Sequence, residues 1–279
     1  ATDLPEDTWD EACEYTFDDA PYKKRVYWGF GKAEPADELV EGPNIKPWPA
    51  MEPLGDDILL KVCSKIMDPV TTTDELIPSG ETSSYRSNPL GLAEFTLSRR
   101  DPEYVGRTKE VDKLEKARVA EGEEKELALE PDLANVFAAI RTISGNENVS
   151  VKDTEVGSMV YAVKPGDGSA REQAASCQRV LGGLANIAKE YATKRYRSNL
   201  INWGMIPFIF EPENLPFANL DYIFVPGIRD AVKEKQPKVT AYAVKDNALE
   251  SFELEIKQLT DDERQIILDG CLINYYKSH

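Results

Sequence analysis

The chain has 279 residues and a formal net charge of −17, from 50 acidic and 33 basic side chains. This much negative charge repels phosphate backbones, so nucleic acid is not expected as a partner. Hydrophobic residues make up 41% of the sequence, enough for a folded core. No apolar run is long enough to cross a bilayer, and no signal peptide is visible, so we expect a cytoplasmic protein with no membrane partner.

The cysteines and the single histidine limit the chemistry that this chain can perform. Cys13, Cys63, Cys177 and Cys271 are widely separated and include no C-x-x-C pair. The last three lie among apolar residues, so we expect buried, reduced thiols there. The only histidine is the terminal His279. A histidine base or a histidine-rich metal site is therefore excluded, and we expect no metal site within the chain.

The first 50 residues are rich in acidic residues, proline and aromatic residues and show no helical or strand period. They contain more aromatic side chains than a disordered tail would: Trp9, Tyr15, Phe17, Tyr22, Tyr27, Trp28, Phe30 and Trp48. We predict an extended linker arm over residues 1–50 that packs along a surface, in preference to a ligand-stacking platform. Residues 51–279 are predicted to form one domain.

The elements of that domain alternate between strands and helices. Strands are predicted at 58–63, 159–163, 184–189, 206–210 and 222–225, followed by a hairpin of 239–244 with 252–256. Helices are predicted as a solvated helix within 107–130, a partly buried helix after Pro131, a helix from Ser169 to Gly182, a basic helix at 191–203 and a last helix capped by Thr260. The cations of the basic helix are interpreted as favourable neighbours of its C-terminus.

The stretch Gly166-Asp167-Gly168-Ser169-Ala170-Arg171 separates a strand from a helix. Such a loop presents unpaired N–H groups and the positive end of a helix dipole, which favours an anion. The guanidinium of Arg171 matches a carboxylate with two parallel hydrogen bonds. Ser169 stands at the expected N-cap, so simple helix capping is the alternative to a functional role.

The motifs along the chain resemble those of the aconitase family, in the same order. The loop Gly-x-Gly-Ser-x-Arg-Glu-x-Ala-Ala of residues 166–175 resembles that family's Gly-x-Gly-Ser-Ser-Arg-Glu-x-Ala. Residues 71–80, Thr-Thr-Thr-Asp-Glu-Leu-Ile-Pro-Ser-Gly, resemble its Thr-Thr-Asp-His-Ile-Ser-x-Ala-Gly, and Arg86 follows at the spacing of a substrate-binding arginine. Downstream, Asn199-Leu200, Gly204 and Ile206-Pro207-Phe208 resemble its Asn-Leu, Gly and Leu-Pro-Leu.

The resemblance implies an α/β fold, the layered β/β/α swivelling domain that forms the C-terminal part of aconitase-type hydratases. It implies Ser169 as the catalytic base, and Arg86, Arg171, Ala170 and Asp74 as substrate-binding residues converging on one pocket. The substrate would be a di- or tricarboxylic acid. The 4Fe–4S cluster of this hydro-lyase family would be held by the remaining domains of the same protein, so this chain alone is expected to be inactive.

Three positions depart from the family pattern. Ala170 replaces the second serine of the glycine loop, Glu75 replaces a histidine, and Ile77 replaces a serine. Loss of two hydroxyls that would face the substrate argues against citrate and favours a separate hydratase branch. Two alternatives remain: the small subunit of a two-chain isopropylmalate isomerase-like enzyme, and a noncatalytic binding module of the same fold. The long arm and the first residue, Ala1, favour a piece of a single longer chain.

Overall fold

The computed structural model describes residues 16–25, 31–32, 34–38, 40–245 and 248–279. The chain divides into two compact units, residues 1–41 and 42–279. In the first unit the structure describes one short helix, α1 (Ala20–Arg25), with Phe17 and Tyr22 largely exposed beside it. Of the other aromatic residues of the predicted arm, Trp48 belongs to the second unit and packs on Trp203 there, with 4.4 Å between ring centroids. Five lie outside the described residues: Trp9, Tyr15, Tyr27, Trp28 and Phe30.

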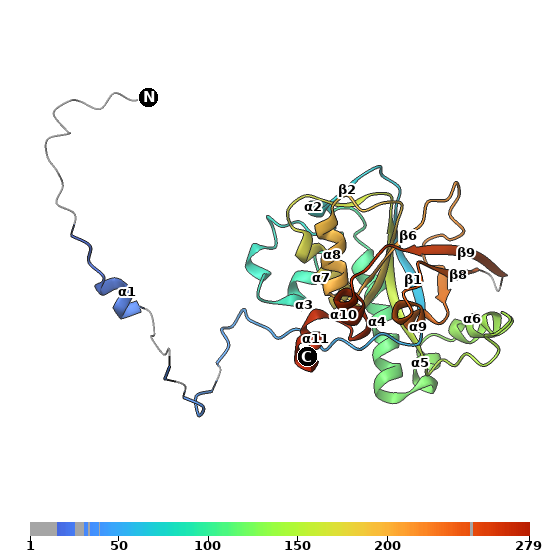
Figure 1. Cartoon of the computed structure of the whole chain (residues 1–279), viewed down its shortest axis with the longest axis horizontal. Coiled ribbons are helices and arrows are strands. Elements are labelled where there is room, and N and C mark those ends of the chain that lie inside the picture. The colour runs from blue at the N-terminus through green and yellow to red at the C-terminus, as the bar shows by residue number, and fades with distance from the viewer. Residues whose placement is uncertain (1–15, 26–30, 33, 39, 246–247) are drawn as a thin grey trace, which may run out of the picture. The chain divides into compact units, whose positions relative to one another are not determined.

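Seven strands of the second unit close into one barrel (Figure 1). Around the barrel they follow the order β1 (Asp57–Ile66), β3 (Thr154–Ala162), β5 (Gly183–Ala188), β6 (Ile206–Ile209), β9 (Ala248–Ile256), β8 (Lys238–Lys245) and β7 (Tyr222–Val225). The first four are parallel, and β9, β8 and β7 are antiparallel to their neighbours. A separate two-stranded sheet pairs β2 (Thr71–Thr72) with β4 (Pro165–Asp167).

Strands β3, β5, β6 and β7 are buried along their whole length and β1 nearly so, whereas β8 and β9 alternate between buried and exposed residues. Successive side chains point to opposite sides of a sheet, so the buried strands face apolar side chains on both sides. In β1, Ile58, Leu60 and Val62 join an apolar cluster that collects residues from all seven barrel strands. Leu59 and Cys63, which alternate with them, join a second cluster that packs the barrel against helices. This explains why strands such as β1 and β3 appear in the sequence as apolar runs, while β8 and β9 show alternating patterns.

The helices lie outside the barrel strands (Figure 1). They are α2 (Thr73–Leu76), α3 (Pro89–Ala93), α4 (Tyr104–Glu121), α5 (Glu123–Leu129), α6 (Asp132–Ile140), α7 (Arg171–Val180), α8 (Lys194–Asn202), α9 (Ile228–Lys233), α10 (Asp261–Leu268) and α11 (Leu272–Ser278). The helix predicted within 107–130 is two helices, because Gly122 adopts a positive φ of 92° between them. In the described part of the chain, none of these helices has the length and apolarity to span a bilayer.

Several predictions for individual elements are confirmed. Thr260 caps α10 in a reciprocal capping box with Glu263, and the 239–256 hairpin is β8 and β9. Cys63, Cys177 and Cys271 are buried free thiols, whereas Cys13 lies outside the described residues. The mixed α/β content agrees with the expected class. The β/β/α order of layers stays a prediction, because here the strands form one closed barrel.

Candidate functional site

Two loops that are far apart in the sequence lie side by side at the β2–β4 sheet. Thr71 pairs with Pro165 and Thr72 with Asp167, so the segment 71–80 runs beside the glycine loop. The N–H of Thr71 also donates to the carbonyl oxygen of Lys164 at 3.0 Å. The two motifs singled out in the sequence therefore share one region of the surface, next to the first turn of α7.

The glycines of the loop allow it to pass between α2 and α8. Gly166 and Gly168 have positive φ angles of 96° and 133°, which side-chain-bearing residues rarely adopt. A Cβ atom on Gly168 would lie 2.2 Å from Oγ1 of Thr73, and one on Gly166 would lie 2.3 Å from the ring of Tyr196. The loop thus needs glycine for both its backbone conformation and its contacts.

Ser169 does not cap α7, contrary to the prediction. The N-cap is Ala170, which makes no side-chain hydrogen bond, and the first helical residue is Arg171. The helix starts later than predicted because Ala170 still has a non-helical ψ of 46°. Ser169 is exposed, and its hydroxyl forms no hydrogen bond with any residue that the structure describes. The capping explanation for this serine is therefore wrong.

Arg171 is half-buried at the start of α7 and has no acidic partner among the described residues. Its Nε atom is buried and makes no hydrogen bond. Arg86 is exposed and, in the same described part of the chain, is likewise free of ion pairs. Two cations close to the glycine loop are thus left without an internal carboxylate.

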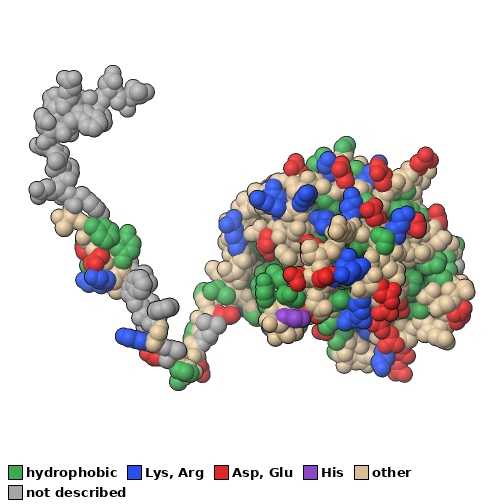
Figure 2. Space-filling model, viewed as in Figure 1, with side chains coloured by type: hydrophobic (Ala, Val, Ile, Leu, Met, Phe, Trp, Pro, Cys, Tyr) green, Lys and Arg blue, Asp and Glu red, His purple; other side chains and the backbone are tan. Residues whose placement is uncertain are grey.

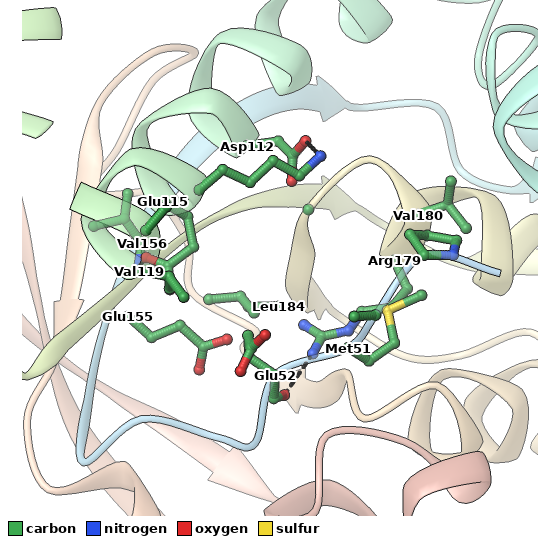
Figure 3. Close-up of a pocket in the computed structure, with 15 residues that line it drawn as sticks. Met51, Glu52, Asp112, Glu115, Val119, Glu155, Val156, Arg179, Val180 and Leu184 are labelled. Carbon is green, nitrogen blue, oxygen red and sulfur yellow. Dashed lines mark hydrogen bonds and ion pairs between the residues drawn. The ribbon is translucent and has the colours of Figure 1, made fainter. Parts of the chain in front are cut away.

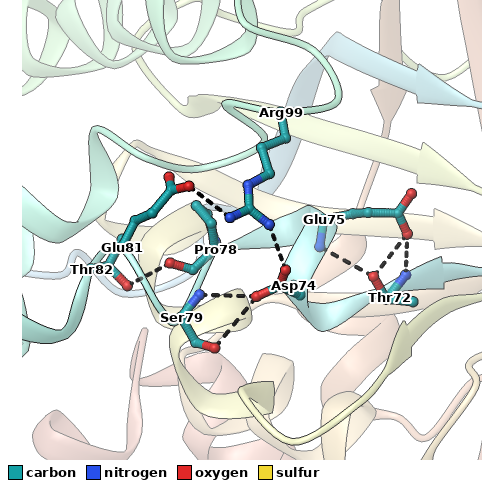
Figure 4. A network of polar contacts seen from close by, with 8 residues as sticks. All are labelled: Thr72, Asp74, Glu75, Pro78, Ser79, Glu81, Thr82 and Arg99. Atoms are coloured by element: carbon teal, nitrogen blue, oxygen red, sulfur yellow. Dashed lines mark hydrogen bonds and ion pairs between the residues drawn. The ribbon is translucent and has the colours of Figure 1, made fainter.

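Asp74, in contrast, is occupied by neighbouring residues (Figure 4). Its Oδ2 accepts from Arg99 at 2.7 Å, and its Oδ1 accepts from the N–H and the hydroxyl of Ser79 at 3.2 and 3.4 Å. Arg99 also pairs with Glu81 at 2.7 Å. The Asp74 carboxylate therefore fixes the turn at 78–82 and does not point freely into a site.

The departures at positions 75 and 77 have structural explanations. Glu75 forms a capping box with Thr72: its Oε2 accepts from the Thr72 N–H at 2.7 Å, and Thr72 Oγ1 accepts from the Glu75 N–H at 3.2 Å (Figure 4). Ile77 has no exposed surface and packs in the core that joins barrel and helices. Helix capping explains the glutamate, and core packing explains the isoleucine.

A small hollow connects the two loops. It has a volume of about 10 Å³ and is lined by Ile77, Ser79, Thr82, Arg86 and Gln173. That volume holds about one water molecule. Arg86 therefore lies close to Gln173 of α7, which follows Arg171 by two residues. This hollow is lined by Arg86 but not by Asp74, Ser169 or Arg171, so the convergence of all four residues on one pocket stays a prediction.

Sequence reasoning missed the role of the start of α8. Thr193 is its N-cap, with Oγ1 accepting from the Tyr196 N–H at 3.2 Å, and this hydroxyl also donates to the Gly166 carbonyl at 3.1 Å. Lys194 and Arg195 thus occupy the first turn, not the C-terminus as predicted, and the helix dipole does not favour them there. Figure 2 shows several basic side chains over the region where Figure 1 labels α2 and α8. The sequence signal for this helix start is Thr193 itself, a preferred N-cap residue directly before the helical pattern.

The scaffold below the loop is held by a buried polar network. The hydroxyl of Tyr196 in α8 accepts from Gln178 of α7 at 2.9 Å and from Asn186 of β5 at 3.1 Å. All three residues are buried, and burial raises the pKa of the tyrosine, so it stays a neutral hydroxyl. The network fixes α7 and α8 relative to the barrel, and with them the glycine loop, which precedes α7 and contacts α8.

The cysteines of the second unit do not fit an iron–sulfur cluster. A cluster ligand must be a thiolate, and burial raises the pKa of Cys63 and of Cys177 to about 12. Cys271 is 1% exposed. Within the described ranges, no group of three histidine, cysteine or acidic side chains is arranged to hold a metal ion.

Comparison with known proteins finds similarity to one family of domains over part of the chain. The family described as the aconitase C-terminal domain matches residues 145–213, which include the glycine loop, α7 and α8. Aconitate hydratase A from Rickettsia conorii is 26% identical over 129 residues, and the same enzyme from Rickettsia felis is also 26% identical over 129 residues. Each match covers 44% of this chain but only 15% of the relative. A crystal structure of 3-isopropylmalate dehydratase from Methanocaldococcus jannaschii is similar with a TM-score of 0.46 and 20% identity, over 80% of this chain and 94% of that one.

Proposed function

Since this chain carries an aconitase-type C-terminal domain, we propose that it supplies one side of the active site of a hydratase or dehydratase acting on a hydroxy carboxylic acid. In this proposal Ser169 is the catalytic base, and Arg171 and Arg86 bind substrate carboxylates. The observation that carries it is an exposed serine hydroxyl without an internal partner, two residues before an arginine that also has none. Both stand at the positive end of α7.

Ser169 needs help to act as a base, because a free serine hydroxyl is a very weak one. The first N–H groups of α7 have no partners within the helix, and they and the dipole favour negative charge at this position. The guanidinium of Arg171 adds a full positive charge. Together these groups would stabilise the serine alkoxide and the carboxylate bound next to it.

The two arginines define the substrate class of the proposal. The planar fork of Arg171 binds one carboxylate with two hydrogen bonds, and Arg86 binds a second from the neighbouring loop. Asp74 acts through the Ser79 turn that it fixes, and Ala170 contributes its backbone at the helix start. Two carboxylate positions suit a di- or tricarboxylic acid held with its C–H group near Ser169.

The proposed site is half of a larger one. The hollow beside Arg86 holds about 10 Å³ and is too small for such an acid. The three cysteines that the structure describes do not fit an iron–sulfur cluster, so in this proposal the cluster belongs to further domains that close over the glycine loop. The isolated chain would then have no hydratase activity.

Substitution of Ser169 by alanine in the enzyme assembled with its cluster-bearing domains tests this function. We expect turnover to fall about 10²–10⁴-fold, the range of general base catalysis. The melting temperature should stay within a degree or two, because the hydroxyl has no hydrogen bond in this structure and exposed substitutions change stability by about 0.5 kcal/mol or less.

Ser251→Ala is the matched control, since Ser251 is an exposed serine on β9, away from the glycine loop. Its turnover should equal that of the wild type. Near-normal turnover of Ser169→Ala would refute the base assignment, and so would equal losses in both variants.

A further inference from the structure

A second cavity lies at the other end of α7. It has a volume of about 360 Å³ and lies between residues 49–52, α4, β3 and the last turn of α7 (Figure 3). Arg179 is roughly 12 Å along the helix axis from Arg171, at 1.5 Å per residue. The cavity is therefore separate from the glycine loop, and its volume lies in the range of small-molecule sites.

The walls of the cavity are mostly apolar, with a few charged groups placed around them. Met51, Val119, Val156 and Leu184 supply much of the apolar surface. Figure 3 shows the carboxylate of Glu155 pointing into the space between these side chains. An apolar cavity with few polar groups is the usual form of a site that binds a small molecule.

Glu155 is the unusual group of this cavity, because it is 3% exposed and only partly hydrogen-bonded. Its Oε2 accepts from the Gly55 N–H at 2.8 Å, whereas its Oε1 accepts no hydrogen bond from the residues that the structure describes. Arg179 faces the same cavity, but no ion pair joins the two side chains. One oxygen of this largely buried carboxylate thus faces the cavity without a hydrogen-bond partner among the described residues.

Arg179 is committed to the protein backbone. Its guanidinium donates to the carbonyl oxygens of Gly183 at 3.2 Å, Glu52 at 3.1 Å and Gly270 at 3.4 Å. These bonds hold the segment around Glu52 and the turn at Gly270 against α7. The arginine is therefore a structural cation that partly offsets Glu155 and cannot turn toward it without releasing the carbonyls.

The other charges at the wall are neutralised within α4. Asp112 pairs with Lys116 at 2.5 Å. Glu115 pairs with Arg118 and accepts from the Val156 N–H at 2.9 Å. The carboxylates left for a ligand are those of Glu155 and the exposed Glu52, which lie near each other in Figure 3. After internal pairing the cavity has an excess of negative charge.

We propose that this cavity is a binding site for a small apolar molecule that carries a protonated amine. Its ammonium group would donate to Oε1 of Glu155 and lie beside Glu52. Its apolar body would pack against Met51, Val119 and Leu184. An anionic ligand would meet two carboxylates with no free cation, and a neutral one would leave them unneutralised.

The titration of Glu155 agrees with this ligand class. Burial raises the pKa of its carboxyl to about 7, and nearby Arg179 lowers it in part. An ammonium group in the cavity would favour the ionised carboxylate, as an opposite charge within a few ångströms does. A bound ammonium group would thus lower this pKa and shift the carboxyl further toward its charged form.

Binding of three matched probes to the full chain tests the proposal: 2-phenylethylamine, 2-phenylethanol and phenylacetate, measured by NMR titration at pH 7.5. They share a ring and a two-carbon chain and differ in charge. We expect the amine to bind at least tenfold tighter than the alcohol, with shifts of the Met51 methyl signal, and phenylacetate to bind most weakly. Equal or tighter binding of the alcohol or the acid would overturn the proposal.

Two variants locate the effect. Glu155→Gln keeps an oxygen for the Gly55 N–H but loses the charge, and it should weaken amine binding at least tenfold. Glu124→Gln, at an exposed acidic residue of α5 outside the cavity lining, should leave it unchanged. If Glu155→Gln does not fold, Val119→Trp fills the cavity from the exposed side of α4 and should abolish amine binding. Unchanged affinity in either cavity variant would contradict the site.

Discussion

The two ends of α7 carry arginines in opposite situations. Arg171 is half-buried at the N-terminal end, and its guanidinium makes no hydrogen bond or ion pair with the residues that the structure describes. Arg179, at the C-terminal end, is 6% exposed and donates to three backbone carbonyls. At the N-terminal end of α7, Arg171 and nearby Arg86 have no internal carboxylate partner. At its C-terminal end lies the cavity that contains the buried Glu155.

The difference separates structural cations from those available to a ligand. A buried guanidinium whose N–H groups are used by carbonyls stabilises the fold, because those carbonyls would otherwise be buried without donors. A guanidinium without internal partners contributes little to stability, so its removal should change the free energy of unfolding only slightly. Beside a helix N-terminus, it can instead bind a carboxylate. Substitution of Arg179 should therefore mainly lower stability, whereas substitution of Arg171 should mainly weaken ligand binding.

The largest effect on stability is expected from Arg179→Ala. Removal of the side chain leaves the buried carbonyls of Glu52, Gly183 and Gly270 without this donor, and we expect a loss of about 3–5 kcal/mol in the free energy of unfolding. Arg171→Ala should change it by about 0.5 kcal/mol or less. Urea denaturation of both variants checks the contrast, and equal losses would remove the distinction between the two ends.

Local features of the glycine-loop end could be predicted from the sequence. Gly166, Gly168 and the helix beginning near Arg171 were found from their residue types, because positive φ angles and helical periods are encoded over a few residues. The prediction still placed the N-cap of α7 one residue early, at Ser169 instead of Ala170, and it missed Thr193 as the cap of α8. Because of the second error, Lys194 and Arg195 were assigned to the C-terminal end of α8, whereas they lie in its first turn.

The other end could not be predicted, because its partners are distant in the sequence. The Glu155 carboxylate accepts from an N–H 100 residues away, and Arg179 donates to a carbonyl 127 residues away. The ion pair of Asp74 could not be predicted for the same reason, since its partner Arg99 lies 25 residues downstream. Only the folded barrel brings such groups together.

The pH dependence of stability sharpens the comparison, since the cavity end of α7 adjoins buried carboxyls. Glu126 in α5 is fully buried, and neither of its carboxyl oxygens has a partner in the structure. Burial and nearby Glu115 raise its pKa from 4.5 to about 8, while Arg118 lowers it in part. The folded state therefore keeps a proton that the unfolded state releases, and stability is lost as the pH rises from about 4.5 through 8.

Glu126→Met removes that proton linkage while keeping a similar volume. We expect it to raise the free energy of unfolding by about 4 kcal/mol at pH 8 and by about 1 kcal/mol at pH 5. Urea titrations at both values measure the difference, with Glu124→Gln as an exposed control on the same helix. A pH-independent effect would show that Glu126 does not titrate as inferred.

A smaller loss of stability is expected from Gly168→Ala at the glycine-loop end. The positive φ of 133° and the contact with Thr73 must both adjust, at a cost of about 1–3 kcal/mol. Because the adjustment displaces Ser169, turnover of the assembled enzyme should fall more than stability does. Gly80→Ala is the control in the neighbouring loop, where an added Cβ meets no atom within 4 Å. Similar effects of both substitutions would refute a specific role for the Gly168 conformation.

The most direct test of the account is the affinity of the assembled enzyme for propane-1,2,3-tricarboxylate, a tricarboxylate without the hydroxyl, measured for the wild type and for Arg171→Lys. A lysine keeps the charge but loses the planar fork that binds a carboxylate with two hydrogen bonds. The account predicts roughly tenfold weaker binding, about 1.4 kcal/mol, with an unchanged melting temperature. Unchanged affinity, or a loss that appears only together with a lowered melting temperature, would contradict the assignment of Arg171 to the substrate site.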